Sequence, residues 1–329
     1  MSEHIPASAA SVADLPCPEC GTAGAVLVDD VSTAELGRLY RQHGVEVAAY
    51  FDGIPTLSRF RCAACDLRFF VPACAGDDSF YEQLQRFDWY YQDEKPEYEF
   101  ARQAIGERRR VLEVGCGKGA FAAFLPSSAA YTGLEFNDEA VRKANEAGLN
   151  VFREPIERHA VAHPGHYDAV CSFQVLEHVS SPRSFLDGCV AALAAGGLLV
   201  IAVPAEDSFL AVAANAPFNM PPHHVLRWTD RALAAMAAAR NLDVVEIWHE
   251  PVAPFHAEWH SRALAHHYFV MHGVGTGRLI DTRLRYRALG RLLANARLRD
   301  FLAQRVARRA PMLRHGHTVV LVARKRRAA

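Results

Sequence analysis

The chain has 329 residues, of which 50% are hydrophobic and 22% are charged, and its formal net charge is −1. This length allows one large α/β domain and a smaller module, with enough apolar material for a core. A net charge near zero excludes a global field that would draw the protein to nucleic acid or to an anionic membrane. We therefore expect neither as a partner.

The N-terminal segment 1–16 has neither a basic start nor a continuous apolar stretch, so we expect a flexible tail and not a signal peptide. The most apolar run, 190–203, is interrupted by two glycines and is too short to span a bilayer. A cytoplasmic protein without membrane contact is the resulting expectation.

Four of the eight cysteines form two C-x-x-C pairs, Cys17-Pro-Glu-Cys20 and Cys62-Ala-Ala-Cys65. Four thiolates in this pattern fit a tetrahedral zinc ion and leave no open coordination position, so the metal would be structural. The two pairs are further apart than the usual spacing of about fifteen to twenty residues, which requires an inserted excursion such as 36–57. The alternative is a pair of unrelated C-x-x-C turns, one of them redox active.

From residue 109 onward the hydrophobic pattern alternates between strand and helix, which implies a mostly parallel sheet with helices on both faces. The predicted strands are 110–114, 130–135, 150–153, 167–173, 197–203, 243–248 and 318–323. The predicted helices are 118–125, 138–147, 182–194 and one from Thr229 to about 240, with Asp138 and Thr229 as N-caps and Gly148 and Gly196 as helix stops.

The chain thus divides into four predicted parts. They are a tail (1–16), a zinc-binding, zinc-ribbon-like module (17–78), a helical connector containing Trp89-Tyr-Tyr91 (79–108), and a Rossmann-like, seven-stranded α/β domain (109–329) with a helical insertion at about 254–311. We expect the insertion to cover one end of the sheet and to shape a substrate pocket.

The most informative segment is Val111–Ala120, in which an apolar strand runs into a turn containing Gly115, Gly117 and Gly119. Glycines there permit unusual backbone angles and let main-chain N–H groups approach a ligand closely. The turn also fits the loose dinucleotide pattern G-x-G-x-x-G/A. Glu135, at the end of the next strand, can hold the ribose hydroxyls of a dinucleotide or of another nucleoside cofactor.

Charge distinguishes the two cofactor classes. The pyrophosphate of a nicotinamide dinucleotide would face Glu113, and at about 4 Å and an effective dielectric near 20 that repulsion costs roughly 4 kcal/mol. S-adenosylmethionine carries an ammonium and a sulfonium, which Glu113 can favour, and one carboxylate that the loop amides and Lys118 can meet. The sequence therefore predicts S-adenosylmethionine as the cofactor.

In open α/β sheets, ligands bind beyond the carboxyl ends of the strands. We expect Glu154 and Ile156 to contact the adenine amino group and ring. The full set of predicted cofactor contacts is Glu113, Gly115, Cys116, Gly117, Lys118, Gly119, Glu135, Phe136, Asn137, Glu154, Ile156, Ser172, Phe173 and Gln174.

Three histidines are candidates for acid–base chemistry. His178 follows the fourth strand and would lie beside the reactive methyl group, with Glu177 orienting it, as a general base for a hydroxyl or an acidic carbon. His223 and His224 end a proline-stiffened turn that could present either of them to a substrate. Any of the three could instead only cap a helix or bond to loop backbone, so the identity of the base stays open.

Taken in order, these segments resemble class I S-adenosylmethionine-dependent methyltransferases over 109–248. The resemblance is carried by the 111–119 loop, Glu135, Tyr167-Asp-Ala-Val, Gln174-Val-Leu-Glu-His-Val179 and Leu193-Ala-Ala-Gly-Gly-Leu-Leu-Val200. It implies that Glu113, Gly115, Gly117, Glu135 and the 172–174 segment bind the methyl donor.

The cysteine pairs resemble those of a bacterial subset in which a zinc-binding module precedes the methyltransferase domain, including sugar C-methyltransferases. Nothing resembles the carboxylate set of magnesium-dependent O-methyltransferases, so no catalytic metal is expected.

The predicted reaction is direct methyl transfer from the sulfonium to a small-molecule acceptor, which is a saccharide, a secondary metabolite or a quinone-like compound, with a histidine as the base. Two alternatives remain. One is methylation of RNA or protein with the zinc module as docking surface, which the near-zero charge disfavours. The other is a non-catalytic scaffold that binds the cofactor without turnover.

Overall fold

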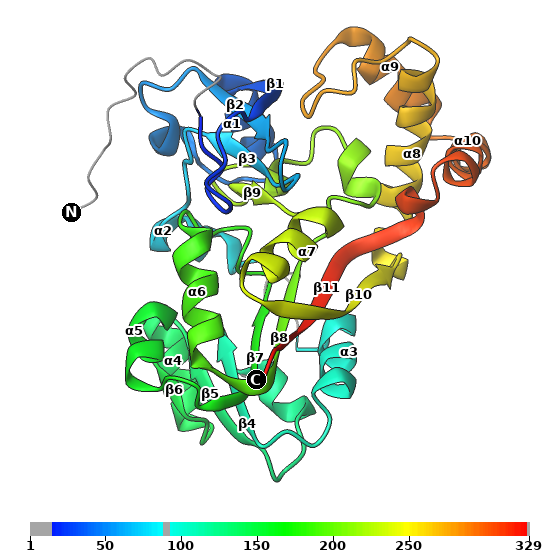
Figure 1. Cartoon of the computed structure of the whole chain (residues 1–329). Coiled ribbons are helices and arrows are strands. Elements are labelled where there is room, and N and C mark those ends of the chain that lie inside the picture. Colours follow the sequence, from blue (N-terminus) through cyan, green and yellow to red (C-terminus); the bar gives the residue numbers. More distant parts are fainter. Residues whose placement is uncertain (1–14, 88–92, 328–329) are drawn as a thin grey trace.

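The computed structural model describes residues 15–87 and 93–327, so the predicted tail lies almost entirely outside the described residues, as does Trp89–Tyr91. The described part contains two β-sheets, one of four strands and one of seven. Figure 1 shows the four-stranded sheet and the helical insertion at the same end of the larger sheet.

Seven strands form the larger sheet: β4 (Arg110–Val114), β5 (Ala130–Leu134), β6 (Val151–Phe152), β7 (Tyr167–Phe173), β8 (Leu193–Pro204), β10 (Leu242–Pro251) and β11 (His315–Lys325). Their order is β10-β11-β8-β7-β4-β5-β6. β11 runs antiparallel to β8 and β10, and the other pairings are parallel. The predicted α/β, mostly parallel seven-stranded sheet is confirmed.

Helices cover both faces of this sheet because its strands carry apolar side chains on both sides. The helices are α3 (Pro96–Ile105), α4 (Asp138–Glu146), α5 (Ile156–Ala162), α6 (Pro182–Ala192) and α7 (Asp230–Ala239). Val111 packs with α3 on one face, whereas its neighbour Leu112 packs with α6 and α7 on the other.

Three local predictions were wrong. The predicted helix 118–125 is only a 3-10 turn, η3 (Ala120–Phe124), because Gly119 is left-handed and the proline after Leu125 disfavours a helical residue before it. The N-cap of α4 is Asn137, whose side chain accepts a hydrogen bond from Ala140 N, and not Asp138. α6 ends before β8 begins, so Gly196, at φ +79°, lies within that strand.

Two other predictions about helix ends are confirmed. Thr229 caps α7 by accepting a hydrogen bond from Ala232 N at 3.1 Å. Gly148 follows the end of α4 with φ +84°, a left-handed conformation that favours glycine.

The N-terminal sheet has the order β1-β2-β3-β9. Its strands are β1 (Val26–Ser32), β2 (Thr56–Arg61), β3 (Arg68–Val71) and β9 (Leu226–Arg227). The helix α1 (Thr33–Gln42) and the 3-10 turn η2 (Ala48–Phe51) lie between β1 and β2, and α2 (Asp78–Leu84) follows β3. The predicted excursion between the cysteine pairs is formed by α1 and η2. Because β9 comes from the later part of the chain and pairs with β3, the N-terminal sheet is completed by residues beyond β8.

A predominantly helical stretch follows β10, as predicted for 254–311. It contains η6 (Pro254–His256), α8 (Ala257–Met271), α9 (Leu284–Leu292), α10 (Ala296–Arg309) and η7 (Pro311–Arg314), while η4 (Phe209–Val212) and η5 (Pro217–Asn219) lie between β8 and β9. Among the described residues, no helix combines the length and the apolar character needed to cross a membrane.

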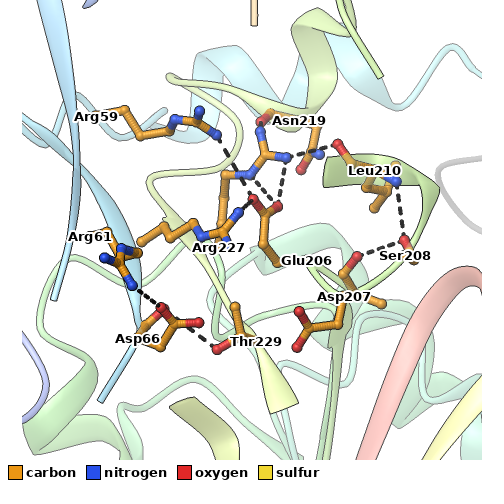
Figure 2. A network of polar contacts seen from close by, with 12 residues as sticks. Arg59, Arg61, Asp66, Glu206, Asp207, Ser208, Leu210, Asn219, Arg227 and Thr229 are labelled. Atoms are coloured by element: carbon orange, nitrogen blue, oxygen red, sulfur yellow. Dashed lines mark hydrogen bonds and ion pairs between the residues drawn. The ribbon is translucent and has the colours of Figure 1, made fainter. Parts of the chain in front are cut away.

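A buried ion cluster joins the two sheets. Figure 2 shows Glu206, which follows β8, between Arg59 of β2 and Arg227 of β9. Arg227 Nε donates to Glu206 Oε2 at 2.6 Å, Arg59 Nη1 lies 3.8 Å from Oε1, and Arg68 of β3 also pairs with this carboxylate. Burial alone would raise the pKa of Glu206, but the three guanidinium groups hold it below its ordinary value.

The Glu206→Gln substitution should destabilise the protein by about 3–5 kcal/mol, because it leaves three largely buried guanidinium groups without their counter-charge. Chemical denaturation at neutral pH measures this change in the free energy of unfolding. Asp243→Asn is the matched control, since the Asp243 ion pair with Arg326 is solvent-exposed and its loss should change the stability little. An equal loss of unfolding free energy in the two variants would show that the ion cluster does not stabilise the contact between the two sheets.

Candidate active site

A large cavity opens at the switch point of the seven-stranded sheet. The chain leaves β4 for β5 and β6 on one side and returns as β7 on the other, the position at which open α/β sheets bind ligands. The cavity has a volume of about 1200 Å³ and is lined by segments that follow β4, β5 and β7. Its wall also includes Tyr81 of α2, Phe218 of η5 and Trp259 of α8. The cavity therefore extends to the N-terminal part and to the helical insertion.

Most of the predicted cofactor contacts line this cavity. They are Gly115, Cys116, Gly117, Lys118, Glu135, Phe136, Asn137, Glu154, Ile156, Phe173 and Gln174. Residues from four separate loops therefore share one cavity, as the strand-end argument predicted.

Glu113, Gly119 and Ser172 are not among the lining residues. Glu113 is 1% exposed and its carboxylate accepts a hydrogen bond from Tyr131 Oη at 2.5 Å, while burial raises its pKa to about 8. Ser172 donates to the carbonyl of Val114 at 3.0 Å. The Glu113 carboxylate thus contacts Tyr131 and does not line the cavity, and its contact with the methyl donor stays a prediction.

The glycine turn and Glu135 are already in contact. Gly115 and Gly117 have φ values of +77° and +53°, in the left-handed region that favours glycine. The Glu135 carboxylate accepts hydrogen bonds from the main-chain N–H groups of Gly117 (2.8 Å), Phe136 (2.7 Å) and Asn137 (2.9 Å). A carboxylate fixed in this way at the end of β5 is positioned to accept hydrogen bonds from a ribose.

Space behind the turn is also restricted. A Cβ atom at Gly115 would overlap the side chain of Val175, which follows β7. Glycine at 115 therefore permits both the backbone conformation of the turn and its close approach to the neighbouring strand end.

The three candidate histidines lie together at the cavity wall. His178 Nδ1 donates to the carbonyl of His223 at 2.5 Å, and His223 Nδ1 donates to the carbonyl of Phe218 at 2.8 Å. His224 Nδ1 donates to Asn219 Oδ1 at 3.0 Å. One ligand nitrogen from each of the three rings lies within 4.8 Å of the others. Burial lowers the pKa of His178 to about 4 and those of His223 and His224 well below their usual range, so the three rings are neutral.

Glu177 lies behind this histidine cluster. Its Oε1 is 3.7 Å from His178 Nε2 and 4.0 Å from His224 Nε2, and the side chain is 1% exposed. Within the described part of the chain, neither carboxylate oxygen has a hydrogen-bond partner. Burial raises the pKa of Glu177 to about 8.

Several lining residues were not predicted from the sequence. Gln174 Nε2 donates to Glu97 Oε1 at 3.4 Å and to Thr318 Oγ1 at 3.3 Å, and Thr318 N donates to Glu250 Oε2 at 3.1 Å. These acids and His317 come from α3, β10 and β11, which reach the cavity only through the topology of the sheet. The one available signal was Glu97, a charged residue on the apolar face of an amphipathic helix.

The two C-x-x-C pairs converge in the N-terminal module. Cys17 Sγ lies 3.7 Å from Cys65 Sγ, and Cys20 Sγ lies 3.5 Å from Cys62 Sγ. All four sulfur atoms lie within 4.8 Å of one another, and none of the four cysteines forms a disulfide within the described residues. A tetrahedral zinc site with Zn–S bonds of about 2.3 Å has sulfur–sulfur separations of about 3.8 Å, so these residues fit a zinc ion.

Comparison with known proteins agrees with this geometry. Residues 85–247 match a family model described as "Methyltransferase domain". Ubiquinone biosynthesis O-methyltransferases from Pectobacterium carotovorum and Klebsiella pneumoniae are 38% and 36% identical over 96 residues, which is 27% of this chain. The chain spans 40% of the length of these relatives. A solved structure of a SAM-dependent methyltransferase from Archaeoglobus fulgidus shares the fold, with a TM-score of 0.51 and 17% identity, covering 74% of this chain and all (100%) of that one.

The matched segment contains β4 to β8 and the glycine turn, so the family match and the cavity fall on the same part of the fold. Over residues 85–247 the chain therefore matches a methyltransferase domain, and it shares its fold with a SAM-dependent methyltransferase.

Proposed function

We propose that this protein transfers a methyl group from S-adenosylmethionine to a hydroxyl group of a small, flat or apolar acceptor, such as a quinone-like compound. The observation that carries this proposal is one continuous cavity that reaches from the glycine turn to the histidine cluster. Pockets for a single drug-sized ligand occupy about 300–1,000 Å³, so a cavity of about 1200 Å³ has room for a donor and an acceptor together.

The donor would occupy the end of the cavity formed by the sheet. The N–H groups of the glycine turn would face the methionine carboxylate, and Glu135 would accept the ribose hydroxyls. Glu154 and Ile156, both at the wall, would contact the adenine. This placement puts the sulfonium near Phe173 and Gln174, which end β7 and lead toward the histidines.

The acceptor would occupy the other end, beneath the covering helices. Tyr81, Phe87, Phe218, Phe255 and Trp259 line this part and favour a planar or apolar acceptor over a free sugar. Holding donor carbon and acceptor oxygen in contact accelerates an in-line displacement, and the histidine cluster would take the proton that the hydroxyl loses. In the simplest form of this mechanism, one of His178, His223 and His224 is the general base.

We also propose that Cys17, Cys20, Cys62 and Cys65 hold a structural zinc ion. The closeness of the four sulfur atoms supports this assignment, and four protein ligands leave no position for a substrate. The zinc would fix the turns that precede β1 and β3, and thereby the N-terminal sheet above the cavity.

Incubation with methyl-labelled S-adenosylmethionine and a panel of catechol, phenol and saccharide acceptors tests the proposed function. Labelled product is expected among catechols or phenols, because aromatic side chains line the acceptor end. Label recovered only in added RNA or protein would favour the macromolecular alternative, and absence of label in every fraction would favour a non-catalytic scaffold.

The Glu135→Ala substitution should weaken S-adenosylmethionine binding by about 10- to 100-fold, because hydrogen bonds to a charged group contribute about 1.5–3 kcal/mol. Isothermal titration calorimetry measures this affinity. Glu139→Ala is the control, since Glu139 is exposed on α4 and pairs only with neighbouring cations. Unchanged affinity in Glu135→Ala, or saturable binding of NAD to the unmodified protein, would contradict the cofactor assignment.

The Cys65→Ser substitution should lower the zinc content by about one ion per chain and reduce the thermal unfolding midpoint, because a structural zinc ion contributes directly to folding. Elemental analysis and thermal denaturation provide the two readouts. Cys74→Ser is the matched control, because Cys74 is a half-buried cysteine outside the cluster. The same zinc content in both variants would rule out zinc at these cysteines.

A further inference from the structure

The histidine cluster has features that a general base does not require. A base needs one imidazole with an accessible nitrogen, whereas here the rings of His178, His223 and His224 bring one ligand nitrogen each to within 4.8 Å of the others. The ring centroids of His178 and His224 are 4.9 Å apart, and those of His223 and His224 are 4.3 Å apart. Three imidazoles in mutual contact, with those of His223 and His224 buried and that of His178 partly buried, resemble a ligand set.

Each ring is oriented by a hydrogen bond from its other nitrogen. The Nδ1 atoms donate to the carbonyl of His223, the carbonyl of Phe218 and the side-chain oxygen of Asn219. Metal-binding histidines characteristically donate their second ring N–H to a carbonyl or carboxylate, which fixes the tautomer and the ring plane. For His178 and His224, this leaves Nε2 as the nitrogen that can bind an ion.

Glu177 supplies an independent observation. Both of its carboxylate oxygens are buried without a hydrogen-bond partner among the described residues, and Oε1 lies 3.7 and 4.0 Å from the Nε2 atoms of His178 and His224. A buried carboxylate without a partner is costly, and a cation placed between it and the imidazoles would satisfy it.

We propose that His178, His223, His224 and Glu177 bind a divalent transition-metal ion at the acceptor end of the cavity. Imidazole nitrogens with one carboxylate oxygen suit zinc and other transition metals, and do not suit magnesium or calcium. This site is separate from the cysteine cluster in both position and ligand chemistry, and it replaces the sequence-based expectation that no catalytic metal is present.

The role of this ion rests on the proposed function, whereas its binding does not. Zinc sites in enzymes can expand to five ligands, so an acceptor hydroxyl could coordinate the ion from the cavity side. Coordination lowers the pKa of the hydroxyl, whose proton is released to water. The acceptor oxygen then forms a bond to the methyl carbon as the carbon–sulfur bond breaks, and the sulfonium becomes a neutral thioether. The imidazoles would act as ligands in this form, and not as the base.

Metal content tests the binding directly. The full-length protein is stripped with a chelator, reloaded with Zn²⁺ or Co²⁺, desalted and analysed for metal. We expect about two ions per chain for the unmodified protein and about one for His178→Ala, His224→Ala and Glu177→Gln. His166→Ala is the control for loss of a histidine, because His166 is exposed outside the cavity, and circular dichroism confirms that each variant is folded.

Cobalt spectra distinguish the two sites. Thiolate ligands give an intense charge-transfer absorption, whereas imidazole and carboxylate ligands give only weak visible bands. The histidine variants should lose the weak bands and keep the charge-transfer band. A folded His224→Ala protein with the same metal content and spectrum as the unmodified protein would overturn the proposal, as would metal binding confined to the cysteines.

Methyl-transfer assays distinguish a wrong role for the second ion from a wrong proposed function. If the second ion binds and chelation at this site abolishes methyl transfer while S-adenosylmethionine still binds, the catalytic role is supported. If the ion binds but methyl transfer proceeds equally without it, the role is overturned and a histidine base is favoured.

Discussion

The carboxylate of Glu206 is buried between the two sheets, and three guanidinium groups offset the cost of burying its charge. Glu206 lies directly after β8, and its partners Arg59, Arg68 and Arg227 come from β2, β3 and β9. Three strands of the N-terminal sheet must therefore meet the end of β8, which seats this sheet beyond the carboxyl ends of the parallel strands. The glycine turn is located at the same edge, and residues of the turn and of the N-terminal part line one cavity. Figure 2 shows the ion cluster that fixes the N-terminal sheet in this position.

The same cluster controls the loop that carries two of the histidines. Besides Glu206, Arg227 contacts the carbonyls of Leu210 (3.0 Å) and Asn219 (3.4 Å). Asn219 in turn accepts the hydrogen bond that orients His224, and the carbonyl of His223 accepts the one that orients His178. A continuous chain of polar contacts thus connects the ion cluster to the histidine cluster. The orientations of the histidine rings therefore depend on the ion cluster between the two sheets as well as on the seven-stranded sheet.

Local pattern was sufficient to predict the seven-stranded sheet, the bounds of β4 and β7, the cap at Thr229 and the grouping of residues after β4, β5 and β7 at one edge. These features depend on hydrophobic alternation and on the rule that parallel strands end at the same edge. The pairing of β9 with β3 was missed because a two-residue strand has almost no pattern of its own. The helix α5 was also missed, and it spans only seven residues. For Glu113, the charge was evident in the sequence, whereas its burial and its contact with Tyr131 required the folded structure.

The two clusters of potential metal ligands show why one was recognised in the sequence and the other was not. The cysteines occur as two local pairs with a spacing that itself indicates metal binding, whereas His178 and His223-His224 are joined only by the fold. In the folded protein the two sets have one property in common, because each brings potential metal-ligand atoms from distant parts of the chain to within 4.8 Å of one another. For the histidines the unpartnered oxygens of Glu177 add a negative charge to that set when it is ionised. A cation bound between the imidazoles and Glu177 would satisfy this carboxylate, whereas a general base alone leaves it without a hydrogen-bond partner among the described residues.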